Sequence, residues 1–217
     1  MSLDGLEIER RFRIKNNGWR AEGIERVRHL HQKTVARDPN GTITRLRLSR
    51  APGCILMDCE AFITIKQKGD GHRIRPEVEW SVPYEETLTA FKSFLGSGLA
   101  KLRYRLKGPA GWDVNLFRGS SAGLELAEIE FATPEKSDEL GTSAFPFPSW
   151  LGEEVTDDPR YLSSNLEREP WLLWGQPCRH CLHLAGDHVE GKVCTRCSCC
   201  CLDVVGAFGD PEPNPDE

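Results

Sequence analysis

The most constraining feature of this chain is a repeated alternation of charged and apolar residues with a period of two. In "TITRLRLSR", Arg45 and Arg47 alternate with Leu46 and Leu48. The same pattern returns in GLEIERRFRI (5–14), AFITIKQK (61–68), RIRPEVEW (73–80), KLRYRLK (101–107), WDVNLF (112–117) and LAEIEF (126–131). Because a β-strand directs successive side chains to opposite faces, each segment predicts a strand with one apolar and one charged face.

Two architectures fit such strands. An open antiparallel sheet would pack its apolar face on helices and leave its polar face in water. In this chain, however, nearly every polar-face position carries Arg, Lys, Glu or Asp, where exposed strands usually also carry Thr and Ser. We therefore expect the charged faces to curl inward, so that the sheet closes into a barrel. A charged lumen of this kind requires a highly charged ligand, because desolvated charges need partners.

The charges of the expected lumen are of two kinds. Basic side chains suited to a polyanion are Arg45, Arg47, Lys66, Lys68, Arg73, Arg75, Lys101, Arg103 and Arg105. Acidic side chains that would repel the same anion are Glu7, Glu9, Glu77, Glu79, Glu128 and Glu130. The two sets are compatible if Mg²⁺ or Mn²⁺ lies between carboxylate and phosphate, because these hard ions prefer oxygen ligands. The combination indicates phosphoryl transfer.

Two helices are expected between the strands. Residues 84–98 place Leu88, Phe91 and Leu95 on one stripe, and residues 157–167 begin with an aspartate cap and a proline. The organisation that follows is α+β: a barrel domain over 1–168, a linker over 169–177, a Cys-rich module over 178–208 and an acidic, disordered tail over 209–217.

Charge and hydropathy limit the partners and the compartment. Residues 1–168 contain 25 Lys/Arg and 25 Asp/Glu, whereas residues 169–217 contain 3 and 8, which together give the net charge of −5. This balance argues against a nucleic-acid partner. Since no apolar run approaches the roughly 18 residues of a membrane span and no signal pattern begins the chain, we expect a cytoplasmic protein without membrane contact.

The cysteines point to a zinc site. Seven of the nine lie between positions 178 and 201, where two Cys-x-x-Cys pairs are separated by twelve residues. The pairs are Cys178 with Cys181 and Cys194 with Cys197. Such spacing predicts a structural zinc site with four thiolates, in which His183, His188 or Cys199 could replace one cysteine. The module would serve stability or a protein partner. The apolar residues Trp171, Leu172, Leu173 and Trp174 would either seat it on the barrel or form a partner-binding patch.

These residues and motifs resemble the CYTH superfamily, or triphosphate tunnel metalloenzymes, which includes thiamine triphosphatase, class IV adenylyl cyclases and bacterial inorganic triphosphatases. The signature Glu-x-Glu-x-Lys of the first strand reads Glu7-Ile8-Glu9-Arg10-Arg11 here. The similarity continues in order through "RLRL", "AFITIKQK", "RPEVEW", "KLRYRL", "GLELAEIEF" and "PSWLGEEVTDDPRYLSSNL", over about residues 5–168. The resemblance implies an eight-stranded antiparallel tunnel, flanked by helices, that binds a triphosphate.

The resemblance also implies roles for individual residues. The metal-side acids would be Glu7, Glu9, Glu128 and Glu130, and the catalytic residues Glu7, Glu9 and Arg11. The substrate ligands would be Arg45, Arg47, Lys66, Lys101 and Arg103, together with Arg75. In the family, water activated by the metal and acidic residues attacks a terminal phosphorus.

Three positions depart from the family pattern. Arg11 replaces the lysine of the signature, and arginine does not release a proton as lysine can. Asn115 stands at the second acid of an acid-x-acid pattern, and Thr34 replaces a tyrosine. The leading hypothesis is a divalent-metal-dependent triphosphatase acting on inorganic triphosphate or a nucleoside or organic triphosphate. The alternatives are an adenylyl cyclase, or a catalytically weak triphosphate sensor that signals through the zinc module.

Overall fold

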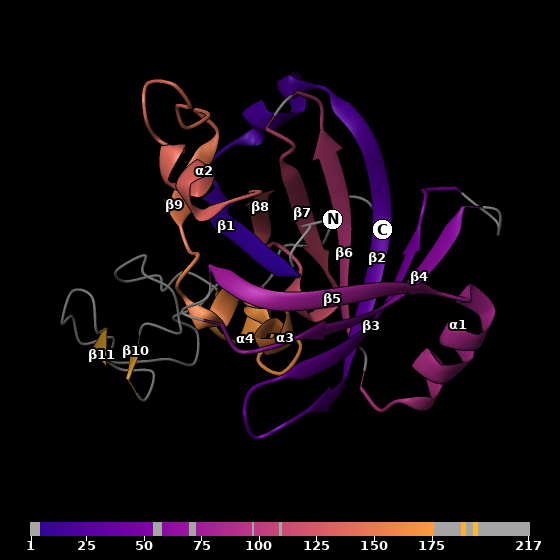
Figure 1. The fold of residues 1–217 in the computed structure, drawn as a ribbon. Helices are drawn as coiled ribbons and strands as arrows, with labels where there is room; N and C mark the ends of the chain where they lie inside the picture. The colour runs from indigo at the N-terminus through magenta and orange to yellow at the C-terminus, as the bar shows by residue number, and fades with distance from the viewer. Residues whose placement is uncertain are drawn as a thin grey trace.

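The computed structural model describes residues 5–53, 58–69, 73–96, 98–108 and 110–175, together with the short strands β10 (His188–Val189) and β11 (Val193–Cys194). Figure 1 shows the described part as a curved sheet wrapped around a central space, with helices against its outside.

The strands of the described part form one closed antiparallel barrel. They are β1 (Leu6–Ile14), β2 (Ile24–Arg37), β3 (Ile43–Arg50), β4 (Cys59–Lys66), β5 (Ile74–Val82), β6 (Leu99–Leu106), β7 (Asp113–Arg118) and β8 (Glu125–Glu130). Their order is β5-β4-β3-β2-β6-β7-β8-β1, and pairing of β5 with β1 completes the ring. The short strand β9 (Leu151–Glu154) adds to the outer edge of β1. The expected eight-stranded antiparallel tunnel is confirmed.

The charged faces of the strands line the lumen. Lys66 of β4 is paired with Glu7 of β1, and Arg103 of β6 is paired with Glu128 of β8. Neither pair joins neighbouring strands, so these side chains meet only because they point into a common interior. Because the ring is closed, the charged face of each strand lies inside the barrel and the apolar face lies outside it.

The main apolar core lies outside the barrel wall. The outward side chains of β1, such as Ile8 and Phe12, are buried with Trp19, Trp112 and Trp150. Ile8 and Phe12 lie on β1, Trp19 lies in the 3₁₀ helix η1 (Asn17–Glu22), and Trp112 and Trp150 lie directly before β7 and β9. On another side of the wall, α1 (Tyr84–Ser93) packs Phe91 against β3 and β4. The helix ends at Ser93, so Leu95 is not on its buried stripe as expected but 99% exposed.

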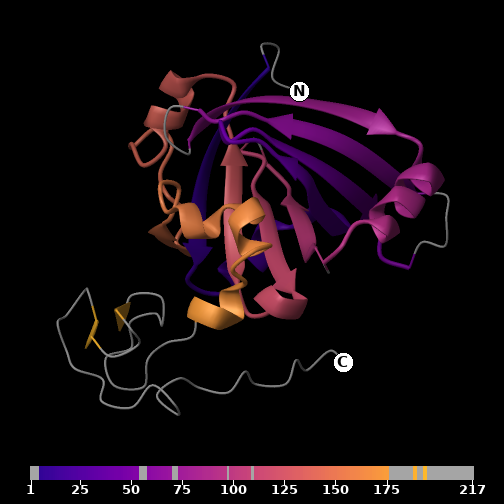
Figure 2. The same cartoon turned by 90° about the horizontal axis from the view of Figure 1, so that it is seen from below.

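One end of the lumen is filled by apolar side chains. At this end the inward positions of the strands are apolar: they are Leu99, Phe117 and Leu126. These side chains pack against aromatic residues of the segment 155–175. The aromatic residues are Tyr161, Trp171 and Trp174. The segment contains η3 (Pro159–Tyr161), α3 (Ser163–Leu166) and α4 (Trp171–Trp174), and its orange helices are seen in front of the barrel strands in Figure 2.

This segment differs in two ways from the sequence expectation. Asp158 caps a helical turn as expected, since its side chain accepts a hydrogen bond from Arg160 N, but Leu162 is extended and divides the expected single helix in two. Trp171 and Trp174, expected within a linker, are buried in the core that closes the lumen, while Leu173 between them is 72% exposed.

Two short strands of the Cys-rich region pair with each other. His188–Val189 pairs antiparallel with Val193–Cys194. Cys178, Cys181 and Cys197, the other expected zinc ligands, lie outside the described residues. In the described part of the chain, no helix has the length and apolar character of a membrane span.

Candidate active site

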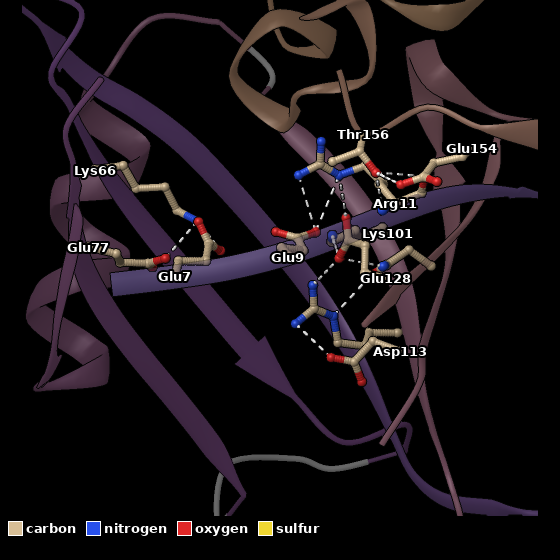
Figure 3. A network of polar contacts seen from close by, with 12 residues as sticks. Glu7, Glu9, Arg11, Lys66, Glu77, Lys101, Asp113, Glu128, Glu154 and Thr156 are labelled. Atoms are coloured by element: carbon tan, nitrogen blue, oxygen red, sulfur yellow. Dashed lines mark hydrogen bonds and ion pairs between the residues drawn. The ribbon is translucent and has the colours of Figure 1, made fainter. Parts of the chain in front are cut away.

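The lumen contains two clusters of ion pairs, which lie next to each other along β1 (Figure 3). In the first, Lys66 Nζ donates to Glu7 Oε1 at 2.6 Å and lies 2.8 Å from Glu77 Oε2. Burial by itself would raise the pKa of Glu7, but the charge and hydrogen bonds of Lys66 outweigh it and hold this pKa well below its ordinary value. Burial, and less strongly repulsion by Glu7, raises the pKa of Glu77. Lys66 thus gathers acids from β1 and β5.

The second cluster is centred on Glu128 of β8. Arg103 Nη2 lies 2.9 Å from Glu128 Oε2, and Arg11 Nε lies 3.6 Å from Glu128 Oε1. Lys101 Nζ lies 3.7 Å from the same carboxylate. Burial opposes ionisation of this group, yet the three cations lower the pKa of Glu128 to about 2. In turn, burial lowers the pKa of Lys101 to about 7, with a further contribution from Arg103 and opposition from Glu128.

Asn115 has a defined place in this second cluster. Its Nδ2 donates to Glu128 Oε2 at 2.8 Å, and its Oδ1 accepts from Arg103 Nε at 3.0 Å. Arg103 also lies 3.2 Å from Asp113, which sequence reasoning did not include among the site residues. An aspartate at position 115 could accept but not donate, so the amide supplies a contact to Glu128 that the acid of the family pattern would not.

Glu9 lies on β1 between the two clusters. Burial is the main reason why its pKa is raised to about 8, and repulsion by Glu128 and Glu7 adds to it. Its partner is Arg11, whose Nε donates to Glu9 Oε1 at 3.3 Å. Arg11 also has a raised pKa, because its acidic neighbours outweigh its burial. Burial therefore makes Glu9 easier to protonate than Glu7 and Glu128, whose cationic neighbours lower their pKa.

Several arginines of the lumen retain unused donors. Arg11 Nη1, Arg45 Nε and Arg47 Nε are buried and have no hydrogen-bond partner within the described residues. The Nη2 atoms of the last two do have partners: Arg45 Nη2 lies 3.9 Å from Glu77, and Arg47 Nη2 donates to Glu79 Oε1 at 2.7 Å. Burying a donor without an acceptor costs about 1–3 kcal/mol, so three such groups in one lumen indicate a place for an oxygen-rich anion.

Two of the expected site residues lie at the periphery. Glu130 is opposite Glu9 in the β1–β8 register, but it is exposed. Arg75 is opposite Glu7 in the β1–β5 register, and its Nε donates to the Gln67 carbonyl at 3.3 Å. Arg73, which the alternation also assigned to the lumen, instead binds α2 (Pro134–Glu139) through Asp138 at 2.7 Å, so this expectation was wrong.

Sequence reasoning missed two contacts of the lumen wall. Arg28 of β2 is buried and bonds the side chains of Asp58 and Glu60, although its segment showed no clear alternation. Thr156 Oγ1 accepts from Arg11 N at 3.0 Å and donates to Glu154 Oε1 at 2.7 Å. No local pattern marks Thr156, because its role depends on where the chain returns beside β1.

The acidic side chains of the lumen offer oxygen ligands to a divalent cation. Within the described residues, no three His, Cys, Asp or Glu side chains already converge as a metal site. The carboxylates of Glu7, Glu9 and Glu128 nevertheless repel one another enough to contribute to the raised pKa of Glu9. A hard divalent cation relieves such repulsion and takes carboxylate oxygens as ligands. By chemistry and charge, these three residues fit the ion.

The chain is similar in sequence to two inorganic triphosphatases. The chain is 34% identical over 109 residues to an inorganic triphosphatase of Nitrosomonas europaea, which covers 49% of this chain and 68% of that protein. It is 29% identical over 171 residues to an inorganic triphosphatase of Acetivibrio thermocellus, covering 77% and 96%. No family model matches the chain.

A solved structure extends the likeness to the fold. The crystal structure of an inorganic triphosphatase superposes with a TM-score of 0.50 at 27% identity, covering 74% of this chain and 93% of that one. The closed eight-stranded tunnel and the sequence identity both indicate the same family. The chain belongs to the inorganic triphosphatase family of the CYTH, or triphosphate tunnel, superfamily.

Proposed function

We propose that this protein is a divalent-metal-dependent triphosphate phosphohydrolase whose substrate lies in the charged lumen. The observation that carries the proposal is the set of buried, unpartnered arginine donors at Arg11, Arg45 and Arg47. A triphosphate presents many anionic oxygens and would satisfy them together. The names of the two relatives favour inorganic triphosphate as substrate.

The basic residues would bind and orient the triphosphate. Arg45, Arg47 and Arg103 offer planar guanidinium groups, and Lys66 and Lys101 offer point charges. Arg75, half-exposed and opposite Glu7, would meet the part of the substrate nearest the mouth. Lys66 now contacts Glu7 and Glu77, so substrate binding would draw it toward phosphate and free carboxylate oxygens.

Glu7, Glu9 and Glu128 would hold Mg²⁺ or Mn²⁺, and Glu130 would contribute from the mouth. When bound, the ion would neutralise phosphate charge and lower the pKa of the attacking water. Water attacks the terminal phosphorus, the bond to the bridging oxygen breaks, and orthophosphate and pyrophosphate leave. Arg11 stays charged throughout, so it would orient Glu9 and Glu128 and stabilise charge on the phosphate rather than accept a proton.

A second candidate is a sensor that binds a triphosphate without turnover. Arg11 favours it, because this arginine is paired with both Glu9 and Glu128 and so competes with a cation for the same carboxylates. In either case we propose that Cys178, Cys181, Cys194 and Cys197 hold a structural zinc ion. A protein partner would bind through that module.

Product analysis separates these functions. The purified chain is incubated with tripolyphosphate, ATP or thiamine triphosphate, each with Mg²⁺ or Mn²⁺, and followed by phosphorus NMR. Release of orthophosphate that Glu7→Gln abolishes supports the hydrolase and identifies the preferred substrate. Cyclic AMP with pyrophosphate would indicate a cyclase, and tight binding without any product would indicate the sensor.

A further inference from the structure

A groove on the outer wall of the barrel is not used by the proposed reaction. It has a volume of about 310 Å³ and lies between α1 and the strands β2, β3, β6 and β7. Its apolar side includes Leu48 and Leu88, and its polar lining includes His29, Arg50 and Arg118. It faces outward because Leu48 belongs to the small core that α1 covers, on the face of β3 opposite the lumen arginines.

Strand register explains why basic residues meet here. His29 on β2 is directly opposite Arg50 on β3. Ala100 on β6 is opposite His31 on one side and Arg118 on the other. Directly opposite residues have Cβ atoms about 4.5–5.5 Å apart, so the small Ala100 leaves a hollow between larger basic side chains. Two arginine and two histidine side chains thus surround one hollow: Arg50, Arg118, His29 and His31.

The two arginines of this groove form no ion pair within the residues that the structure describes. Within the described part of the chain, Arg50, Arg118 and His29 form no ion pair or side-chain hydrogen bond. Burial, and then the charges of Arg50 and Arg118, lower the pKa of His29. Two acidic residues interact electrostatically with residues that line the groove: Glu125 with Arg118, and Glu85 with Tyr84. Two arginine charges thus share one groove without an acidic side chain bound between them, and such a concentration of positive charge favours an anion.

We propose that this groove is a second anion site, which binds a phosphate group free or carried by a small organic molecule. Arg50 and Arg118 reach the hollow from opposite sides and would donate to phosphate oxygens, with His29 and His31 adding hydrogen bonds. The ring of Tyr84 and the side chain of Leu88 would contact an organic group if one is present. The side chains that would bind the anion lie on the outer face of the wall, although Lys101, whose amino group lies in the lumen, also contributes to the lining. The proposal does not depend on the proposed hydrolysis.

The test follows the imidazole signals of His29 and His31 by NMR in the full chain, with inorganic phosphate and adenosine monophosphate as separate probes. We expect saturable shifts and a rise in the pKa of His29 on binding. The Arg50→Gln/Arg118→Gln variant should bind at least about tenfold more weakly, since it lacks two charge-assisted donors. The Arg26→Gln variant, with an exposed change on β2, the strand that carries His29, should bind normally.

The tunnel provides the decisive control. Arg47→Gln weakens the lumen but should leave the histidine shifts unchanged. Equal affinities for the two probes would assign the site to free phosphate, and tighter adenosine monophosphate binding would assign it to an organic phosphate. Absence of histidine shifts, equal shifts in the double variant, or loss of the shifts in Arg47→Gln would overturn the proposal. An unchanged circular dichroism spectrum and an unchanged midpoint of denaturant unfolding would show that the double variant is folded.

Discussion

Lys66 Nζ lies 2.6 Å from Glu7 Oε1, although the two residues are 59 positions apart and their strands are not neighbours in the barrel. The pair exists because β5 closes the ring onto β1 and brings β4 within reach. The same lysine also contacts Glu77, so the pair marks where acidic and basic sides of the lumen meet.

Glu7→Gln should reduce phosphate release from tripolyphosphate by on the order of 100-fold, the scale of losing one electrostatic contact at a reacting centre. It removes both a carboxylate oxygen for the cation and the anionic partner of Lys66. Steady-state assays with Mg²⁺ and Mn²⁺ measure the effect. Glu25→Gln, an exposed change on β2, is the matched control and should keep full activity. Equal turnover in both variants would remove Glu7 from the site.

Arg11→Lys should raise turnover several-fold. Arginine contacts Glu9 and Glu128 together, whereas a lysine offers one compact charge that competes less with a cation for both carboxylates. Titration of activity against Mg²⁺ should show saturation at lower metal concentration in the variant. If Arg11→Lys is as active as the natural chain or less so, the arginine has not weakened catalysis and its role is positive.

Glu9 should make folding stability depend on pH in a particular direction. Its pKa is about 8 when folded, against an ordinary value of 4.5, so between these values the folded state binds more protons than the unfolded state. The contribution of Glu9 to stability therefore decreases as the pH rises from about 4.5 to about 8. Lys101, with a folded pKa of about 7 against 10.5, acts in the opposite direction above pH 7.

The Glu9→Gln variant isolates the first of these effects. Denaturant unfolding of the variant and the natural chain at pH 5 and pH 8 measures it. The variant should gain stability relative to the natural chain at pH 8 and much less at pH 5. A stability difference that is the same at both pH values would contradict the raised pKa of Glu9.

Trp171→Ala should lower the free energy of unfolding by about 3–5 kcal/mol, the usual range for a buried large aromatic residue. Trp171 packs against Trp174 with ring centroids 4.9 Å apart, and the Arg13 guanidinium lies 5.4 Å from a Trp171 ring. Leu173→Ala, on the exposed side of the same helix, should change stability by less than about 0.5 kcal/mol. Similar losses in both variants would mean that α4 does not close the lumen.

The full chain should contain one zinc ion per molecule. Elemental analysis after extensive dialysis measures it, and Cys178→Ser with Cys181→Ser should remove the metal, because two of four thiolates are lost. Cys59→Ser, a cysteine on the barrel wall, is the control and should retain it. A natural chain without zinc would refute the metal site.

The sequence by itself determined which side chains share a face. Arg45 and Arg47, or Glu7 and Glu9, had to lie on one side of their strands because side-chain direction alternates along a β-strand whatever the tertiary fold. For the same reason, the apolar partners of these residues predicted a buried outer face. The residue at which α1 ends and the break at Leu162 were harder to predict from the sequence, because packing against the barrel decides them and local helix propensity does not.

Only the tertiary structure decided which charges meet. Whether Arg73 turns to the lumen or to α2, and whether Glu130 is buried, depends on where the strand ends and what covers it. The Lys66–Glu7 contact and the unused donor of Arg11 arise from ring closure between strands distant in sequence. Local alternation specifies faces, but pairing across a lumen depends on the order and register of the whole sheet, which no short segment contains.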